Sequence, residues 1–185
     1  MDWEKLTNDV VTAASAAFDS LRTEKSNEHF YVFVLYTDGD AWTILPSANS
    51  LEQHEVKVRD TGETNELQIA CYKWASAEWA YEGWKADLFN GIYLDLENYR
   101  KTMPRSAEAY EAYKNSVHDC MIAALKKMDQ NGFFGKDREN ILIYISSSDG
   151  DEGYGLENQS VKQLNPAQSY LPFLGRYGEE SSAES

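Results

Sequence analysis

The run His29–Tyr36 constrains the fold more than any other part of the chain. Its residues are aromatic or β-branched at nearly every position, and in a strand successive side chains point to opposite faces. A strand that is apolar on both faces has to be covered on both faces, which predicts a central position in a sheet. Ile141–Ile145 has the same character. We therefore expect two buried strands with helices packed on them.

Two further strands are expected. Asp38-Gly39 is a strong hairpin signal, which predicts a second strand over Ala41–Leu45 that Pro46 stops. Leu67–Trp74 alternates in polarity and predicts a third strand. The expected fold class is α+β, with an antiparallel or mixed sheet of about four strands packed with amphipathic helices.

Apolar residues at helical spacing predict amphipathic helices over 2–22, over 86–101, and from a cap at Ser106 to Asn131-Gly132. Asn49 with Glu52 has the character of a capping box and predicts a short helix over about 50–59. Two later stretches complete the expectation: Ser76 is expected to cap a short helical turn, and residues 156–175 are expected to be irregular or weakly helical.

Length and charge limit the classes of function. The 185 residues suit one domain, which we expect over 1–175, followed by a disordered acidic tail over 176–185. The formal net charge of -14 argues against nucleic-acid binding, because phosphate contacts need clusters of Lys and Arg. No stretch approaches the roughly 20 apolar residues of a membrane span. Cys71 and Cys120 lack a CxxC partner and are expected to be reduced core thiols of a cytoplasmic protein.

The segment 74–84 holds three tryptophans, a tyrosine and two glutamates, and it has two interpretations. Its tryptophans can anchor the core, because an indole buries a large apolar area. Alternatively, Trp74, Glu78, Trp79 and Tyr81 line a pocket with an acid at its centre. Trp84, beside Gly83 and Lys85, is the tryptophan expected to be exposed.

Two acidic turns follow expected strands. Asp38-Gly39-Asp40 is explained by turn chemistry alone. The second turn carries Asp149, Asp151 and Glu152 after the last strand. We expect this second turn to be an acidic loop that faces a partner.

Patterns typical of catalysis or of metal and cofactor binding are not found. His118, Asp119 and Cys120 are adjacent, but neighbours on a helix point in different directions, so they do not form a nucleophile–base pair. His29, His54 and His118 fall in different elements and lack metal-ligand spacing. The sequence thus favours a binding protein over an enzyme, with no cofactor and no metal.

The order of segments resembles a bacterial family, the domain-of-unknown-function 4303 family. The residues that carry the resemblance are Phe30–Asp38 with Asp40, Pro46–Ser50, Trp74–Glu82, Ser148-Asp149 and Ser160–Asn165, of which Glu78–Tyr81 is the most specific part. The resemblance implies a soluble α+β protein without an established enzyme activity. It also implies a relation to small immunity-type proteins that bind and block a bacterial toxin.

The expected function is therefore a non-catalytic binding protein of immunity type. Its partner would be a protein toxin with a basic surface, since opposite charges speed association. The expected contact residues are Trp84, Asp149, Asp151 and Glu152. The alternative is a small-molecule-binding or enzymatic module with its aromatic pocket around Trp74, Glu78 and Trp79.

Overall fold

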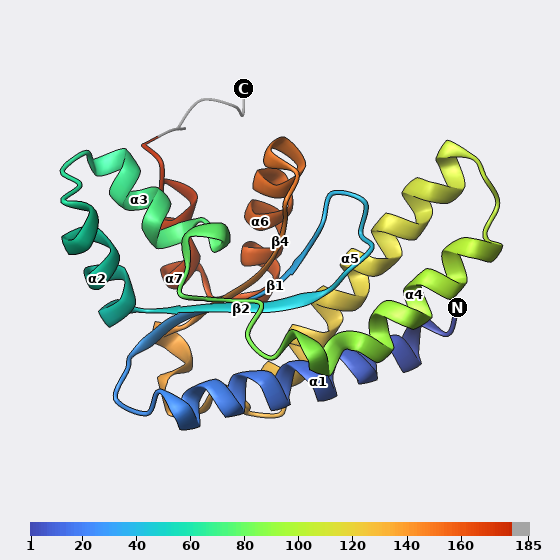
Figure 1. The fold of residues 1–185 in the computed structure, drawn as a ribbon, viewed down its shortest axis with the longest axis horizontal. Helices are drawn as coiled ribbons and strands as arrows, with labels where there is room; N and C mark the ends of the chain where they lie inside the picture. Colours follow the sequence, from blue (N-terminus) through green and yellow to red (C-terminus); the bar gives the residue numbers. More distant parts are fainter. Residues whose placement is uncertain (179–185) are drawn as a thin grey trace.

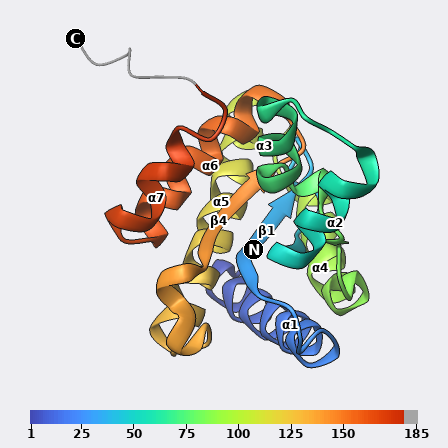
Figure 2. The ribbon, with the colours of Figure 1, turned by 90° about the vertical axis from the view of Figure 1, so that its left-hand side faces the viewer.

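A mixed four-stranded sheet forms the centre of the molecule (Figure 1). The computed structural model describes residues 1–178, apart from the side chains of Asp137 and Asp151. The sheet order is β3-β2-β1-β4, with β1 antiparallel to β2 and parallel to β4 (Figure 2). The strands are β1 Phe30–Thr37, β2 Leu45–Ser50, β3 Tyr81–Glu82 and β4 Leu142–Ser147. The predicted α+β class with a mixed sheet is confirmed.

Helices cover both faces of this sheet. The α-helices are α1 Trp3–Glu24, α2 Leu51–Thr61, α3 Glu66–Trp74, α4 Asn90–Thr102, α5 Ala107–Gln130, α6 Gly150–Leu164 and α7 Ala167–Leu174. Three short 3-10 turns are η1 Ser76–Glu78, η2 Ala86–Phe89 and η3 Gly135–Asn140. Apolar side chains of α1, α4 and α5 form one core cluster with the sheet, and those of α3, α6 and α7 form the other. Within residues 1–178, no helix is both long and apolar enough to cross a membrane.

Strand β1 is central, as its composition predicts. Phe33 and Leu35 point into the cluster with α1, and the Phe18 and Phe33 rings are 4.5 Å apart. Val34 points into the opposite cluster, where Tyr144 and Phe173 lie. Each such side chain contributes about 1.5–3 kcal/mol when it is fully buried. Both faces of β1 therefore stabilise the fold.

The second strand lies later in the chain than predicted. The stretch 41–44 is a loop, because the Asp38 carboxylate accepts hydrogen bonds from the backbone N–H groups of Asp40, Trp42 and Thr43. Pro46 does not stop the strand but lies within it. Strand β3 pairs with Ser47 and Ala48, so Pro46 lies before that pairing begins, at a part of β2 where proline is tolerated.

Four further predictions of local structure were wrong. Residues 66–74 form helix α3 instead of a strand, and the Asn65 side chain caps it by accepting from Gln68 N at 3.1 Å. The short turn η1 has no side-chain cap, so Ser76 does not serve as one. The stretch 150–174 is mostly regular helix. Asp149 caps α6 there, so the expected acidic loop is the start of a helix.

The outer edge of β4 is covered by side chains that follow it in sequence. Asn165 donates from Nδ2 to the Ile143 carbonyl at 2.7 Å and accepts from the Ile143 N–H at 3.0 Å. The Ser160 hydroxyl accepts from the Ile145 N–H at 3.1 Å. These contacts satisfy backbone groups that an exposed edge strand would offer to other chains.

Candidate functional site

The loops that follow the two parallel strands meet at one edge of the sheet. Strand β1 ends at Thr37 and β4 at Ser147, and the Ser148 N–H donates to the Thr37 carbonyl at 2.9 Å. Gly39 N–H donates to the Ser148 hydroxyl at 3.2 Å. We call residues 38–43 together with 148–153 the carboxyl edge; in Figure 1 its first loop lies between α6 and α5. The carboxyl ends of parallel strands are where α/β sheets commonly bind ligands.

The loop 38–43 is held rigidly and presents a tryptophan to solvent. Asp40 accepts a hydrogen bond from the Tyr110 hydroxyl, and the Ala41 carbonyl accepts one from the Tyr113 hydroxyl at 2.7 Å. Ala41 is left-handed, with φ of 54°, and such strain persists only where neighbours over-determine it. The side chain of Trp42 is consequently held outside, with 48% of its surface exposed.

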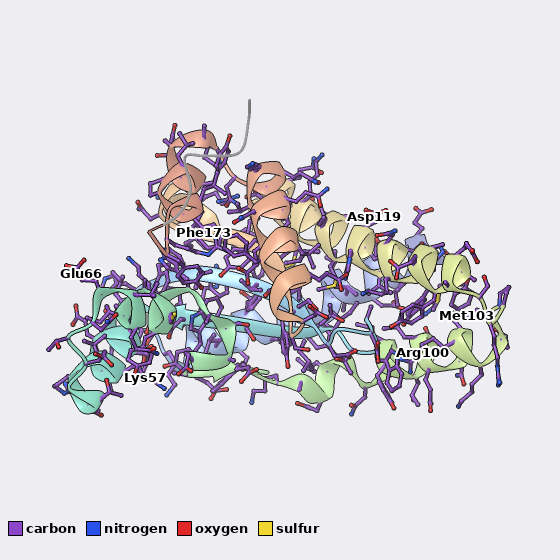
Figure 3. The ribbon with its side chains drawn as sticks, turned by 90° about the horizontal axis from the view of Figure 1, so that it is seen from above. Lys57, Glu66, Arg100, Met103, Asp119 and Phe173 are labelled. Atoms are coloured by element: carbon purple, nitrogen blue, oxygen red, sulfur yellow. The ribbon has the colours of Figure 1, made fainter. Side chains whose placement is uncertain are left out.

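The Arg100 guanidinium lies over the exposed indole, 4.5 Å from the ring centroid of Trp42. Arg100 comes from α4 and is labelled in Figure 3. A cation stacked on an aromatic face favours one orientation of the ring. The indole of Trp42 is therefore exposed but not free to rotate without losing this contact.

Acidic groups surround the same edge. Asp149 caps α6 by accepting from Glu152 N at 3.3 Å, and the Glu152 carboxylate pairs with Lys114 Nζ at 2.5 Å. Burial lowers the pKa of Lys114, but the hydrogen bond that it donates to Glu152, together with the charges of Glu152, Glu111 and Asp149, outweighs burial, so that the pKa is raised overall. Asp151 follows in α6, and its side chain lies outside the described part of the chain. Asp38 and Asp40 thus come from a loop, and Asp149 and Glu152 from the start of α6. These two segments touch, although they are far apart in sequence.

Trp84 does not join this edge. It packs edge to face on Tyr81, with ring centroids 5.6 Å apart, on the side of the sheet covered by α1. It is half-buried, and its Nε1 is buried without a hydrogen-bond partner among the described residues. The exposed tryptophan is Trp42, which sequence reasoning missed. Its position in a polar turn that begins Asp38-Gly39-Asp40 was the available signal.

The four residues of the alternative aromatic pocket are split between the two faces of the sheet. Tyr81 belongs to the cluster with α1 and donates its hydroxyl to Glu28 at 2.7 Å. Trp74 packs edge to face on Phe173 in the opposite cluster. Glu78 and Trp79 line one pocket together, and its other wall is α2.

A pocket of about 310 Å³ lies behind the carboxyl edge, between the end of β4 and the start of α6. On its wall, Glu157 accepts from the Ser146 hydroxyl at 2.6 Å and from Arg176 Nη2 at 2.8 Å. Burial raises the pKa of Glu157. Arg176 falls in the stretch expected to be a disordered tail, yet its side chain is fully buried. Residues 179–185 of that stretch lie outside the described part of the chain.

Comparison with known proteins gives one match. The model of a family described as Domain of unknown function (DUF4303) matches residues 10–166. This chain belongs to the DUF4303 family. The matched region contains the whole sheet and both loops of the carboxyl edge. No curated protein and no solved structure matches the chain significantly.

Cys120 and His118 of this DUF4303 protein are buried on α5. Cys120 is buried and donates its thiol to the Trp3 carbonyl at 3.4 Å, and burial raises the pKa of that thiol. Burial also lowers the pKa of His118. Among the side chains that the structure describes, no group of three or more His, Cys, Asp or Glu residues is arranged to hold a metal ion.

Proposed function

We propose that this DUF4303 protein is a non-catalytic binding protein that holds a basic protein partner against its carboxyl edge. The observation that carries the proposal is Trp42, an exposed indole on a rigid loop flanked by acids. Tryptophan is enriched among the residues that dominate binding energy at protein interfaces. A side chain already held by Arg100 and by the strained loop loses little conformational entropy on binding.

Charge supports a basic partner. The whole chain carries a formal net charge of -14. At the carboxyl edge, Asp40 and Asp149 are both exposed, and the segments that carry them are neighbours. Opposite charges on two surfaces raise the rate of association and suppress wrong partners. Glu152 contributes less, because Lys114 already pairs with it.

The partner class that we propose is a bacterial protein toxin with a basic surface, which the DUF4303 protein would bind and block in the cytoplasm. This is the role of an immunity protein. The proposal is supported by the acidic charge of the chain and by the exposed Trp42 at the carboxyl edge. An immunity protein needs only to cover a surface, and a rigid aromatic anchor with an acidic rim is suited to that task.

The test is affinity purification with the tagged wild-type protein, followed by a dissociation constant measured with the purified partner. We expect a basic partner whose affinity falls as salt is added. Trp42→Ala should weaken binding by about 30-fold or more, since hot-spot truncations cost about 2 kcal/mol or more. The matched control is Leu67→Ala, which changes another exposed apolar residue on α3. A partner that binds Trp42→Ala as tightly as wild type would refute the proposal.

A further inference from the structure

A second pocket, of about 350 Å³, lies between α2 and the segment 78–80. We call it the α2 pocket. One face of α2 lines it with Gln53, Lys57 and Asp60, and Trp79 forms part of the opposite wall. Its volume falls in the range of small-molecule sites.

Asn49 lines this pocket and carries an unused acceptor. The residue is 2% exposed, and its Nδ2 donates to the Tyr31 hydroxyl at 3.0 Å. The hydrogen of that hydroxyl goes to the Lys73 carbonyl, so Tyr31 can only accept from Asn49. The orientation of the amide is therefore determined, and Oδ1 is the atom with no hydrogen-bond partner among the described residues. Leaving a buried acceptor unpaired costs about 1–3 kcal/mol.

Glu78, which lines the pocket together with the acid Asp60, has only a weak internal partner. Glu78 pairs with Lys57 Nζ at 2.9 Å, but the two side chains are 37% and 39% exposed. Exposed ion pairs of this kind are worth about 0–1 kcal/mol, so another cation can replace Lys57 at little cost. Trp79 is fixed by its Nε1, which donates to the Lys73 carbonyl at 3.1 Å, and it offers an aromatic wall.

We propose that the α2 pocket binds a small organic cation, an ammonium or guanidinium group on a short carbon chain. The group donates a hydrogen bond to Asn49 Oδ1 and pairs with Glu78 in place of Lys57. The carbon chain lies against Trp79. This proposal is independent of the binding function proposed above, because Lys57 and Arg100, which mark the two sites, lie toward opposite ends of the molecule in Figure 3.

The test is an NMR titration of the full chain with agmatine, and with n-butylurea as the neutral isostere of its guanidinium end. We expect agmatine to shift the amide signals of α2 and residues 78–80 and to bind at least about tenfold more tightly than n-butylurea, since charge-assisted hydrogen bonds are roughly twice as strong as neutral ones. A peptide with one internal arginine serves as the second probe. Binding of agmatine alone supports a small organic cation as the ligand, and binding of both probes supports a guanidinium group that an arginine side chain can also supply. A peptide that binds when agmatine does not would overturn the proposal.

Four variants separate a site from a structural role. Glu78→Gln should weaken agmatine binding by about tenfold or more, whereas Lys57→Met should tighten it by removing the competing cation. Asn49→Leu should abolish binding, and Glu78→Gln keeps the test decisive if Asn49→Leu does not fold. Glu55→Gln is the control, because Glu55 is an exposed acid on α2 that does not line the pocket. Absence of shifts at millimolar agmatine, or shifts unaffected by Glu78→Gln and Lys57→Met, would overturn the proposal.

Discussion

Gly153 determines how closely α6 approaches the sheet. A Cβ atom built on Gly153 would lie 2.6 Å from the Ser147 carbonyl oxygen, whereas contacts of a real Cβ are essentially never shorter than 3.0 Å. In Gly153→Ala the backbone must therefore move by at least about 0.4 Å. The obstructing atom belongs to the backbone of β4, so side-chain rotation cannot relieve the clash. Overpacking of this kind typically costs about 1–3 kcal/mol.

Helix propensity acts in the opposite direction and provides the control. Alanine is favoured over glycine in a helix interior by about 0.5–1 kcal/mol. Gly155 lies two residues later in α6, and a Cβ built there meets nothing within 4 Å. Gly155→Ala should therefore stabilise the protein by about 0.5–1 kcal/mol. Gly153→Ala, in the same helix, should lower the free energy of unfolding by about 1–3 kcal/mol.

The assay measures the free energy of unfolding of both variants and of the wild type in urea. Unfolding is monitored by circular dichroism and by tryptophan fluorescence. A loss of about 2 kcal/mol corresponds to a fall in melting temperature of about 4–8 °C for a chain of this size. Equal m-values would show that the change lies in the folded state. If Gly153→Ala were as stable as Gly155→Ala, α6 could not lie as close to β4 as the structure places it. The position of the carboxyl edge would then also be incorrect.

Two further predictions concern buried polar groups. Asn165→Ala should cost about 2–4 kcal/mol in urea unfolding, because it leaves the N–H and C=O of Ile143 without their partner; a loss below about 1 kcal/mol would mean that water replaces the amide. Burial lowers the pKa of His118 in the folded state. Because the unfolded chain then binds a proton at His118 more tightly, the free energy of unfolding should fall as the pH drops below 6.5, the ordinary pKa of histidine. His118→Gln should make the free energy of unfolding less dependent on pH between about pH 7.5 and about pH 5.5. An unchanged slope would mean that other groups cause the pH dependence.

Local patterns were sufficient wherever a segment carries its own evidence of burial or of a helix end. His29–Tyr36 is apolar on both faces and forms the central strand. Ser106 caps α5, as predicted, by accepting from Ala109 N at 3.2 Å. Such features depend on side-chain alternation and on hydrogen bonds between residues three apart, both of which are present in the sequence itself.

Segments of intermediate polarity were decided by their neighbours in space. Residues 66–74 satisfy both a strand and a helix pattern, and no residue of α3 is fully buried. The spacing of apolar residues therefore did not distinguish a helix from a strand. Asp38 was correctly assigned to a turn, but its carboxylate accepts hydrogen bonds from three following residues, Asp40, Trp42 and Thr43, and β2 begins only at Leu45. That shift depends on three-dimensional hydrogen bonding that the dipeptide Asp38-Gly39 does not encode.

The candidate site shows the same division. The sequence by itself determined the acidic charge, the central strand, the long helices and the presence of two acidic turns. Only the tertiary structure brought those turns together, buried half of Trp84 and exposed Trp42. The physical reason is that exposure depends on which distant segments cover a side chain. Tyr110, Tyr113 and Arg100, which hold the Trp42 loop, are all at least 58 positions away from Trp42 in the chain.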